Sequence, residues 1–289
     1  MYAVSGTLVV VGSANADLVV EVARRPAAGE TVLGGDTRVV PGGKGANTAV
    51  AAARSGGLVR FIGAVGQDAH GDVVLASLTE AGVDVSGVRR VARPTGVAYI
   101  AVTPDGENSI IVSPGANGDL LPADVRLDGA RVVVASLEVP VPVVEHAVLA
   151  AGQAGVRAVV NLSPVAVLSP QVFALLDPLV VNEHEAAGLG NLLALGVRSA
   201  VVTRGALGAD VITAEGTTTV PAPKVDVVDT TGAGDAFTGA LAVELANGES
   251  LVDAVRVAVK VASLSVTLPG AQPTYPTQAR TNRSASSRP

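Results

Sequence analysis

A turn of small residues joins two apolar runs in the stretch Val228-Asp229-Thr230-Thr231-Gly232-Ala233-Gly234-Asp235-Ala236-Phe237-Thr238-Gly239-Ala240. The Ala-rich run after the turn predicts a helix, whose first N–H groups have no partner within it. These N–H groups and the helix dipole together favour an anion such as phosphate. Asp235 would repel that anion unless it acts there, for example as the base for an alcohol attacking a phosphoryl group. The alternative is an ordinary helix start, where Asp is common.

A second glycine-rich turn, Pro41-Gly42-Gly43-Lys44-Gly45-Ala46-Asn47, also precedes an Ala-rich run. Its glycines allow close approach of a ligand, while Lys44 and Asn47 add a cation and an amide. It is not a Walker motif, because Gly45 stands where Ser or Thr is required and Arg38 stands at the first glycine position. No Gly-x-Gly-x-x-Gly follows the first apolar run, so the fingerprint of a dinucleotide site is missing. By itself the turn is more typical of a flexible loop.

Apolar β-branched runs alternate with Ala-rich helical patterns along the chain. We expect buried strands at residues 8–11, 59–65, 132–135, 158–161, 179–181 and 200–203. We expect helices at residues 47–55, 73–81, 143–154, 236–245 and 252–265. This alternation predicts an α/β fold, a three-layer α/β/α sandwich around a mostly parallel sheet.

Two stretches, residues 17–40 and 96–112, break this alternation. Both predict short strands with no helix between them, the second around the turn Thr103-Pro104-Asp105-Gly106. Residues 277–289 are polar and lack apolar periodicity, which predicts a disordered tail. We therefore expect one domain over residues 1–276, followed by this tail.

The composition excludes several classes of protein. With 26 acidic and 20 basic residues the net charge is −6, and no basic patch for nucleic acid stands out. The chain has no Cys, which excludes disulfides and Cys-bound zinc, and its three scattered His residues argue against a His-rich metal site. We find no signal peptide, and every long apolar stretch is interrupted before it reaches the length of a membrane span. We expect a cytoplasmic protein without a nucleic-acid or membrane partner.

Four motifs occur in the order found in one enzyme family. They are the Asn15/Asp17 pair, residues 42–47, residues 182–185 and residues 229–235. With these motifs the chain resembles the ribokinase-like (PfkB) carbohydrate kinases from about Leu8 to Pro276. The resemblance implies that residues 17–40 and 96–112 form a small β-sheet lid over a sugar site. It also implies a homodimer that pairs through this lid.

The resemblance assigns active-site residues by position. Asp235 is expected to be the general base, and the N–H groups of Gly232, Ala233 and Gly234 are expected to hold the γ-phosphate. The residues expected to bind the sugar are Asn15, Asp17, Gly43, Lys44, Gly45, Asn47, Glu138 and Asp235. The alternatives are a solvated turn residue for Asp17 and a helix-capping carboxylate for Glu138.

The resemblance also implies an ATP site with Mg²⁺. Asn182 and Glu185 match an Asn-x-x-Glu motif that acts near the nucleotide phosphates and the magnesium ion, largely through water. The residues expected around the adenosine and phosphates are Thr203, Arg204, Gly205, Ala206, Leu207, Gly208 and Gly234. An exposed helix start with a capping Asn is the alternative for residues 182–185.

A monovalent cation is the third ligand that the resemblance implies. K⁺ would lie beside the anion-binding turn, held by oxygen atoms. The expected ligands are Asp229, Thr231, Ser265, Leu268, Gly270 and Thr274. Alternatively, Asp229 simply ends its strand and caps the turn.

Three positions depart from the family pattern. Residues 186–196 replace a longer insert, Val259 stands where Asn or His is usual near the adenine, and Leu268 replaces a usual Arg. The first two weaken the expected nucleotide site, whereas a main-chain ligand at Leu268 would survive the change.

The resemblance implies ATP-dependent phosphorylation of D-ribose at its 5-hydroxyl. An intact Asp235 favours a kinase over a catalytically weak sugar- or nucleotide-binding protein, which the departures leave open. Within the family, a kinase for another sugar or for a nucleoside is the alternative.

Overall fold

Nine strands form the central sheet of the computed structural model, which describes residues 7–279 and 281. Their order is β13-β12-β11-β10-β9-β8-β1-β4-β5. The pairs from β11 to β5 are parallel, and β12 and β13 form an antiparallel edge. The strands are β1 (Thr7–Val11), β4 (Val59–Gly66), β5 (Asp84–Val91), β8 (Ala130–Ser136), β9 (Arg157–Asn161), β10 (Leu176–Asn182), β11 (Ala200–Thr203), β12 (Ala209–Thr213) and β13 (Gly216–Val220).

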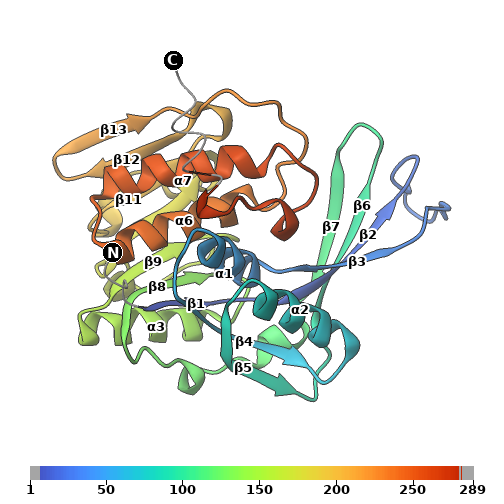
Figure 1. Ribbon diagram of the computed structural model, residues 1–289, viewed down its shortest axis with the longest axis horizontal. Helices are drawn as coiled ribbons and strands as arrows, with labels where there is room; N and C mark the ends of the chain where they lie inside the picture. Colours follow the sequence, from blue (N-terminus) through green and yellow to red (C-terminus); the bar gives the residue numbers. More distant parts are fainter. Residues whose placement is uncertain (1–6, 280, 282–289) are drawn as a thin grey trace.

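Helices cover both faces of this sheet (Figure 1). Side chains alternate along a strand, so Leu8 and Val10 of β1 join the core beneath α1, α2, α6 and α7, whereas Val9 and Val11 join the core beneath α3. The helices are α1 (Lys44–Arg54), α2 (Ala69–Glu80), α3 (Val141–Ala154), α4 (Pro170–Phe173), α5 (Glu183–Leu189), α6 (Ala233–Asn247) and α7 (Leu251–Ser265). The predicted three-layer α/β fold is confirmed.

The second sheet stands to one side of the three layers (Figure 1). It has the order β3-β2-β6-β7, with β2 and β6 parallel and the other pairs antiparallel. Its strands are β2 (Asn15–Glu21), β3 (Arg38–Gly42), β6 (Gly96–Val102) and β7 (Asn108–Ser113). We call these four strands the lid.

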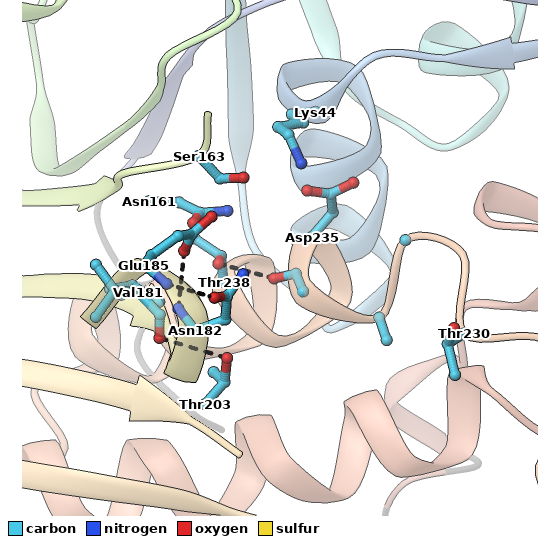
Figure 2. Close-up of a pocket in the computed structure, with 14 residues that line it drawn as sticks. Lys44, Asn161, Ser163, Val181, Asn182, Glu185, Thr203, Thr230, Asp235 and Thr238 are labelled. Atoms are coloured by element: carbon cyan, nitrogen blue, oxygen red, sulfur yellow. Dashed lines mark hydrogen bonds between the residues drawn. The ribbon is translucent and has the colours of Figure 1, made fainter. Parts of the chain in front are cut away.

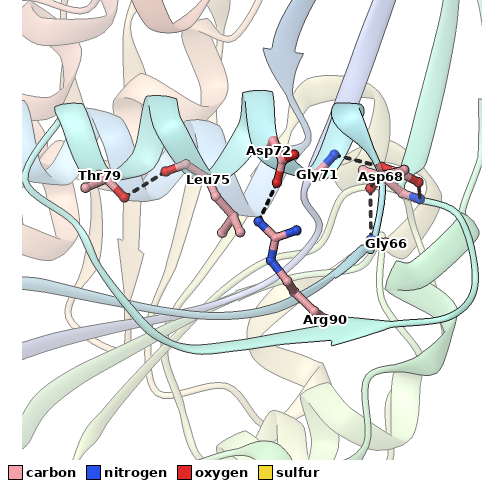
Figure 3. A network of polar contacts seen from close by, with 8 residues as sticks. Gly66, Asp68, Gly71, Asp72, Leu75, Thr79 and Arg90 are labelled. Carbon is pink, nitrogen blue, oxygen red and sulfur yellow. Dashed lines mark hydrogen bonds and ion pairs between the residues drawn. The ribbon is translucent and has the colours of Figure 1, made fainter.

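The lid connects to the core at the start of α2 (Figure 3). Asp68 caps α2 by accepting from the N–H of Gly71 at 2.9 Å, and it also accepts from the N–H and hydroxyl of Thr95 at 2.8 and 2.6 Å. The Thr95 hydroxyl in turn accepts from the N–H of Gly66, the last residue of β4, at 2.9 Å. One carboxylate therefore ties a central strand and a core helix to the residue before β6.

Each of the six strands and five helices expected from the alternation is present, but the helices begin earlier than predicted. α1 begins at Lys44 and α2 at Ala69, because their first turns are built from glycine and polar residues that carry no apolar periodicity. The strands β5, β12 and β13 were not expected, since β5 is half-buried, β13 is largely exposed and both lack an apolar run.

The predicted tail at residues 277–289 lies mostly outside the described residues. Within it, Gln278, Ala279 and Thr281 are helical, and the carbonyl of Thr281 accepts from the Lys260 ammonium. Within residues 7–279 and 281, no helix combines the length and apolar character needed to cross a membrane.

Candidate active site

The candidate site lies beyond the carboxyl ends of the parallel strands, where open α/β sheets bind their ligands. β9, β10 and β11 end at Asn161, Asn182 and Thr203, and these three side chains line one cavity of about 230 Å³. The first turn of α6 closes the other side of this cavity, which Figure 2 shows with Lys44 and Asp235. Side chains from distant parts of the sequence thus meet at one edge of the sheet.

The anion-binding turn requires glycine at its centre. Gly232 is the N-cap of α6 with φ 71°, a conformation that disfavours other residues. A Cβ added there would lie 2.3 Å from the hydroxyl oxygen of Tyr275, which donates to the carbonyl of Gly232 at 3.1 Å. Ala233 and Gly234 are the first two residues of the helix, and both line the cavity. The N–H of Ala233 donates to the carbonyl of Thr230 at 3.2 Å, and the start of the helix faces a space that an anion can enter.

Asp235 lies in the first turn of α6 with 5% of its surface exposed. Asn47 donates from Nδ2 to its Oδ2 at 3.0 Å, and the Lys44 ammonium points toward the same carboxylate (Figure 2). Burial raises the pKa of Asp235 to about 6, a shift that Lys44 and the Asn47 hydrogen bond reduce and Glu138 increases. A carboxylate with this pKa is ionised at neutral pH and is close to the range that suits a general base.

The start of α1 packs directly on the loop after β1. A Cβ on Gly45 would lie 2.5 Å from the main-chain carbonyl carbon of Gly12, so the two backbones touch. Gly43 caps the helix with φ 89°, and a Cβ on it would lie 2.8 Å from the main-chain nitrogen of Asn15. The glycine turn is therefore a rigid contact between two segments, and this close packing argues against the flexible loop that the sequence left open.

Two further carboxylates interact electrostatically with Asp235, Asp17 from the lid and Glu138 from the segment after β8. Glu138 accepts from the hydroxyl of Ser13 at 2.6 Å and from the N–H of Lys44 at 3.1 Å. Glu138 does not cap α3, which has no side-chain cap, but its bond to Lys44 lies at the first residue of α1. Asp17 lies so close to Gly42 that a Cβ there would approach its Oδ2 to 2.1 Å. Burial, then Glu138, then Asp235 raise the pKa of Asp17 to about 7.

Asn117 is a site residue that the sequence did not reveal. It is buried, donates from Nδ2 to Oδ1 of Asn15 at 2.7 Å and accepts from the N–H of Ala14 at 2.9 Å. These contacts fix the amide of Asn15, whose partner lies 102 residues away in the sequence. The turn Pro114-Gly115-Ala116-Asn117 carries no motif, so only the fold identifies Asn117.

The expected phosphate-side residues meet in the cavity of about 230 Å³. Asn182 and Glu185 cap α5 reciprocally, with the N–H of Asn182 bonded to Oε2 of Glu185 at 2.8 Å and the N–H of Glu185 bonded to Oδ1 of Asn182 at 2.9 Å. The capping role proposed as the alternative is therefore present in a pair that also lines the cavity. Six lining residues were not predicted: Asn161, Ser163, Val180 and Val181, which stand outside any motif, and Thr230 and Thr238, which lie within the stretch 228–240 but were given no role.

A larger, more apolar cavity of about 610 Å³ adjoins the first through Thr203, Thr230, Ala233 and Gly234. Gly205, Ala206 and Gly208 line it as expected, and so does Val259. The remaining lining residues include the missed apolar wall of Ala222, Pro223, Val225, Val227, Phe237, Ala262 and Val266.

Two of the expected nucleotide residues lie outside both cavities. Arg204 instead forms ion pairs with Glu183 and Asp210, each at 3.2 Å. Leu207 is 59% exposed. The hairpin between β11 and β12 turns these two side chains away from the cavity that its glycines line.

Comparison with known proteins decides how this geometry is interpreted. The family model described as pfkB family carbohydrate kinase matches residues 5–278. The chain belongs to this family. Bacillus subtilis ribokinase is 38% identical over 281 residues, covering 93% of this chain and 96% of its own. A Thermotoga maritima ribokinase structure superposes with a TM-score of 0.90 at 32% identity, covering 97% of this chain and 99% of its own. The structure of Arabidopsis thaliana ribokinase complexed with ribose and ATP gives 0.89 at 31% identity, covering 96% and 98%.

In this carbohydrate kinase, Asp229 ties the anion turn to the segment after α7. Its Oδ1 accepts from the N–H and hydroxyl of Thr231 at 2.9 and 2.6 Å, and its Oδ2 accepts from the N–H of Gly270 at 2.8 Å. Burial raises the pKa of Asp229, but these hydrogen bonds outweigh burial and hold it below the ordinary value. The turn-capping role that the sequence left open is therefore present.

Of the other expected cation ligands in this kinase, two have hydroxyls that are bonded to main-chain carbonyls, and one is a partly exposed apolar residue. The Thr274 hydroxyl donates to the carbonyls of Gly270 and Ala271 at 2.9 and 2.7 Å, and the Ser265 hydroxyl donates to the carbonyl of Ala262 at 2.8 Å. Leu268 is 45% exposed. The described part of the chain contains no cluster of three or more His, Cys, Asp or Glu suited to a metal ion. Any cation here would rely on Asp229 and main-chain oxygens.

Proposed function

We propose that this carbohydrate kinase transfers the γ-phosphate of ATP to the 5-hydroxyl of D-ribose, giving D-ribose 5-phosphate and ADP. The observation that carries the proposal is the buried Asp235, held by Asn47 and facing Lys44 at the helix start where the two cavities adjoin. The ribokinases that match nearly the whole chain support ribose as the substrate.

In this proposal Asp235 takes the proton of the attacking hydroxyl as the oxygen bonds to phosphorus and ADP leaves. The N–H groups of Gly232, Ala233 and Gly234 stabilise the charge on the transferred phosphoryl group. Lys44, which lines the same cavity, adds a positive charge on its other side. These groups supply electrostatic stabilisation where the negative charge builds up.

The sugar hydroxyls would meet a ring of polar groups on the lid side. Asp17 and Asn15 come from β2, Glu138 follows β8, and Asn47 belongs to α1. The glycines at 43 and 45 bring the backbone within reach of the sugar. Each buried polar group left unpaired by a wrong sugar costs about 1–3 kcal/mol, which gives this site its selectivity.

The nucleotide would occupy the two adjoining cavities. The apolar cavity of about 610 Å³ suits the adenine, and the smaller one beside Asn182 and Glu185 suits the phosphates. Two oxygen-bearing side chains fit a water-mediated Mg²⁺ site, because this ion keeps several waters and borrows phosphate oxygens. Mg²⁺ held there by Asn182 and Glu185 through water would neutralise charge on the phosphates. The use of ATP agrees with a reaction in the cytoplasm.

A kinase for a larger riboside is the second candidate. A third cavity, of about 480 Å³, lies beside Lys44 and Glu138 and is walled by Val112, Leu137 and Pro140. This apolar space next to the sugar residues would admit a base or another substituent on the sugar.

One assay separates these functions. Purified protein is incubated with ATP, Mg²⁺ and D-ribose, 2-deoxy-D-ribose, other sugars or nucleosides, and ADP release is coupled to a dye. We expect the highest kcat/KM with D-ribose. A higher value with a nucleoside favours the second candidate, and a protein that binds sugar without releasing ADP contradicts both.

We further propose that K⁺ activates the enzyme from a site beside Asp229. The lowered pKa keeps this carboxylate ionised, and a large, weakly hydrated cation bound by oxygens can fix the shape of the anion turn.

Replacing Na⁺ with K⁺ at constant ionic strength is expected to raise kcat. Asp229→Ala should abolish this response, and Asp229→Asn, which keeps a hydrogen-bond acceptor, should lose most of it. Activity indifferent to K⁺ across a wide concentration range would contradict the proposal and leave the role of Asp235 intact.

We also propose that two copies pair through the outer face of the lid. Val39, Leu18, Tyr99 and Ile111 are register partners across its four strands, so they form one apolar row on the face opposite Asp17. Ile111 and Tyr99 are 71% and 51% exposed, which favours a partner. Sedimentation should show a dimer for the wild type and a monomer for Ile111→Lys. A wild type that stays monomeric at every concentration would rule out this pairing.

A further inference from the structure

A chain of hydrogen bonds runs from α2 to the carboxylate of Asp235. The hydroxyl of Ser77 donates to Oε1 of Gln272 at 2.6 Å, Nε2 of Gln272 donates to Oδ1 of Asn47 at 2.9 Å, and Nδ2 of Asn47 donates to Oδ2 of Asp235 at 3.0 Å. Gln272, Asn47 and Asp235 are 2%, 6% and 5% exposed. These three residues therefore lie in the protein interior, Ser77 is partly exposed, and the four come from separate elements.

The direction of these bonds matters for the carboxylate. The amide of Asn47 can present either its nitrogen or its oxygen to Asp235, and only the nitrogen donates to a carboxylate. Gln272 holds the amide in the productive orientation by donating to Oδ1 on the far side. Ser77 does the same for Gln272. Each group donates toward Asp235, and bonds aligned in this way polarise one another in a low-dielectric interior.

The segment that carries Gln272 is itself held firmly. Gln272–Thr274 form a short 3₁₀ helix, and Arg54 donates to the carbonyls of Pro273 and Tyr275, each at 3.1 Å. Tyr275 is 2% exposed and reaches the carbonyl of Gly232. The backbone is thus fixed on both sides of Gln272, so its side chain reaches Asn47 from a defined position.

We propose that Gln272, oriented by Ser77, is a positioning residue that holds the amide of Asn47 so that its nitrogen faces the catalytic base. This rests on the proposed function, in which Asp235 is the base. Gln272 does not touch the substrates and acts only through Asn47. The second hydrogen on Nδ2 of Asn47 remains available for a sugar hydroxyl, so one amide serves both the base and the sugar.

Loss of this orientation should change how Asp235 titrates. Asp235 feels Lys44 and the Asn47 hydrogen bond, which favour its ionised form, and Glu138, which disfavours it. Its charge is also felt by the neighbouring Asp17 and Tyr275. A misoriented Asn47 removes one of the two favourable interactions. The pKa of Asp235 then rises, and the acidic limb of the kcat/KM profile moves to higher pH.

The main test is Gln272→Met, which keeps the approximate size of the side chain and removes its amide. With D-ribose and ATP we expect kcat to fall about ten- to a hundredfold near pH 7, since the Oδ1 of Asn47 loses the donor that Gln272 supplies. The KM for ATP should stay within about twofold. The acidic limb should move to higher pH, whereas a general loss of packing would lower activity equally at every pH.

Two variants on the same chain make the test sharper. Ser77→Ala leaves the amide of Gln272 in place but removes its orienting donor, so it should give the same changes to a smaller extent. Ser199→Ala is the matched control. It also removes one hydroxyl bond, to Oδ1 of Asp177 at 2.6 Å, but just before β11, away from the cavities, and it should leave kcat and the pH profile unchanged.

A double-mutant cycle tests whether Gln272 acts through Asn47. In an Asn47→Leu background, Gln272→Met should have no further effect on kcat or on the pH profile, because the amide that it orients is gone. Additive losses would overturn the inference, and so would a Gln272→Met protein with wild-type kcat and an unmoved acidic limb. A wild-type protein inactive on D-ribose would instead overturn the proposed function, and this inference with it. The two failures are distinguishable, because failure of the proposed function is already seen in the wild type, whereas failure of this inference is seen only in the variants.

Discussion

Asp235→Asn is expected to lower kcat by about 10²–10⁴-fold, the usual contribution of a general base. The amide keeps the size of the side chain but takes up no proton from the sugar hydroxyl. Binding of D-ribose, measured by calorimetry, should be largely kept, because the other polar groups of the sugar site remain. A variant that turns over within a few-fold of the wild type would show that Asp235 is not the base.

Asp253→Asn is the matched control for this substitution. Asp253 occupies the same position in the first turn of α7 as Asp235 does in α6, but it is exposed and bonded to its own N-cap, Ser250. The control should keep wild-type kcat. The proposed mechanism uses the ionised form of Asp235, whose pKa is about 6, so kcat/KM should fall as the pH drops through 6. An unchanged rate at pH 5 would argue against a base with this pKa.

Asp17→Ala is expected to raise the KM for D-ribose about ten- to a hundredfold and to leave the KM for ATP within about twofold. The physical reason is that sugar hydroxyls lose a buried carboxyl partner, a loss of about 1–3 kcal/mol, while the nucleotide cavities contain no part of Asp17. Initial rates with each substrate varied in turn measure both constants. Asp36→Ala is the control, since Asp36 is an exposed Asp near the lid strand β3.

The stability of the same variant distinguishes sugar binding from a folding role. Burial and two neighbouring carboxylates raise the pKa of Asp17 from 3.8 to about 7, so its ionisation destabilises the folded state increasingly between these two pH values and fully above the higher one. At pH 8, Asp17→Ala should therefore leave the Tm unchanged or raise it. A lower Tm with equal losses for both substrates would point to a folding role instead.

Much of the fold could be predicted because its signals are local. The β-branched runs of β1, β8 and β9 are buried on both faces of the sheet, so they are continuous and easy to recognise. β5 and β13 were missed for the converse reason, because half-exposed strands with mixed side chains carry no such run. The early starts of α1 and α2 were missed because capping turns have no apolar period.

The candidate site likewise has residues that local sequence signals revealed and side-chain positions that these signals did not give. Residues 229–235 and 42–47 were recognisable because anion-binding turns and close backbone contacts demand particular residue types in consecutive positions. Arg204 belongs to such a stretch, yet its side chain pairs with Glu183 and Asp210 outside the cavities. A motif states which residues are present and not where each side chain points, since that depends on what packs around it.

The sequence by itself determined the order of the six buried strands and five longest helices, the two glycine turns and the acid at the start of α6. Each depends on backbone conformation and residue type over a few consecutive positions. Only the tertiary structure decided that Asn117 fixes Asn15 and that Gln272 fixes Asn47, partners 102 and 225 residues apart. It also decided that Asp17 and the Leu18–Tyr99 row occupy opposite faces of the lid. The orientation of an amide, and the surroundings of each face of a strand, depend on the groups that the folded chain places next to them.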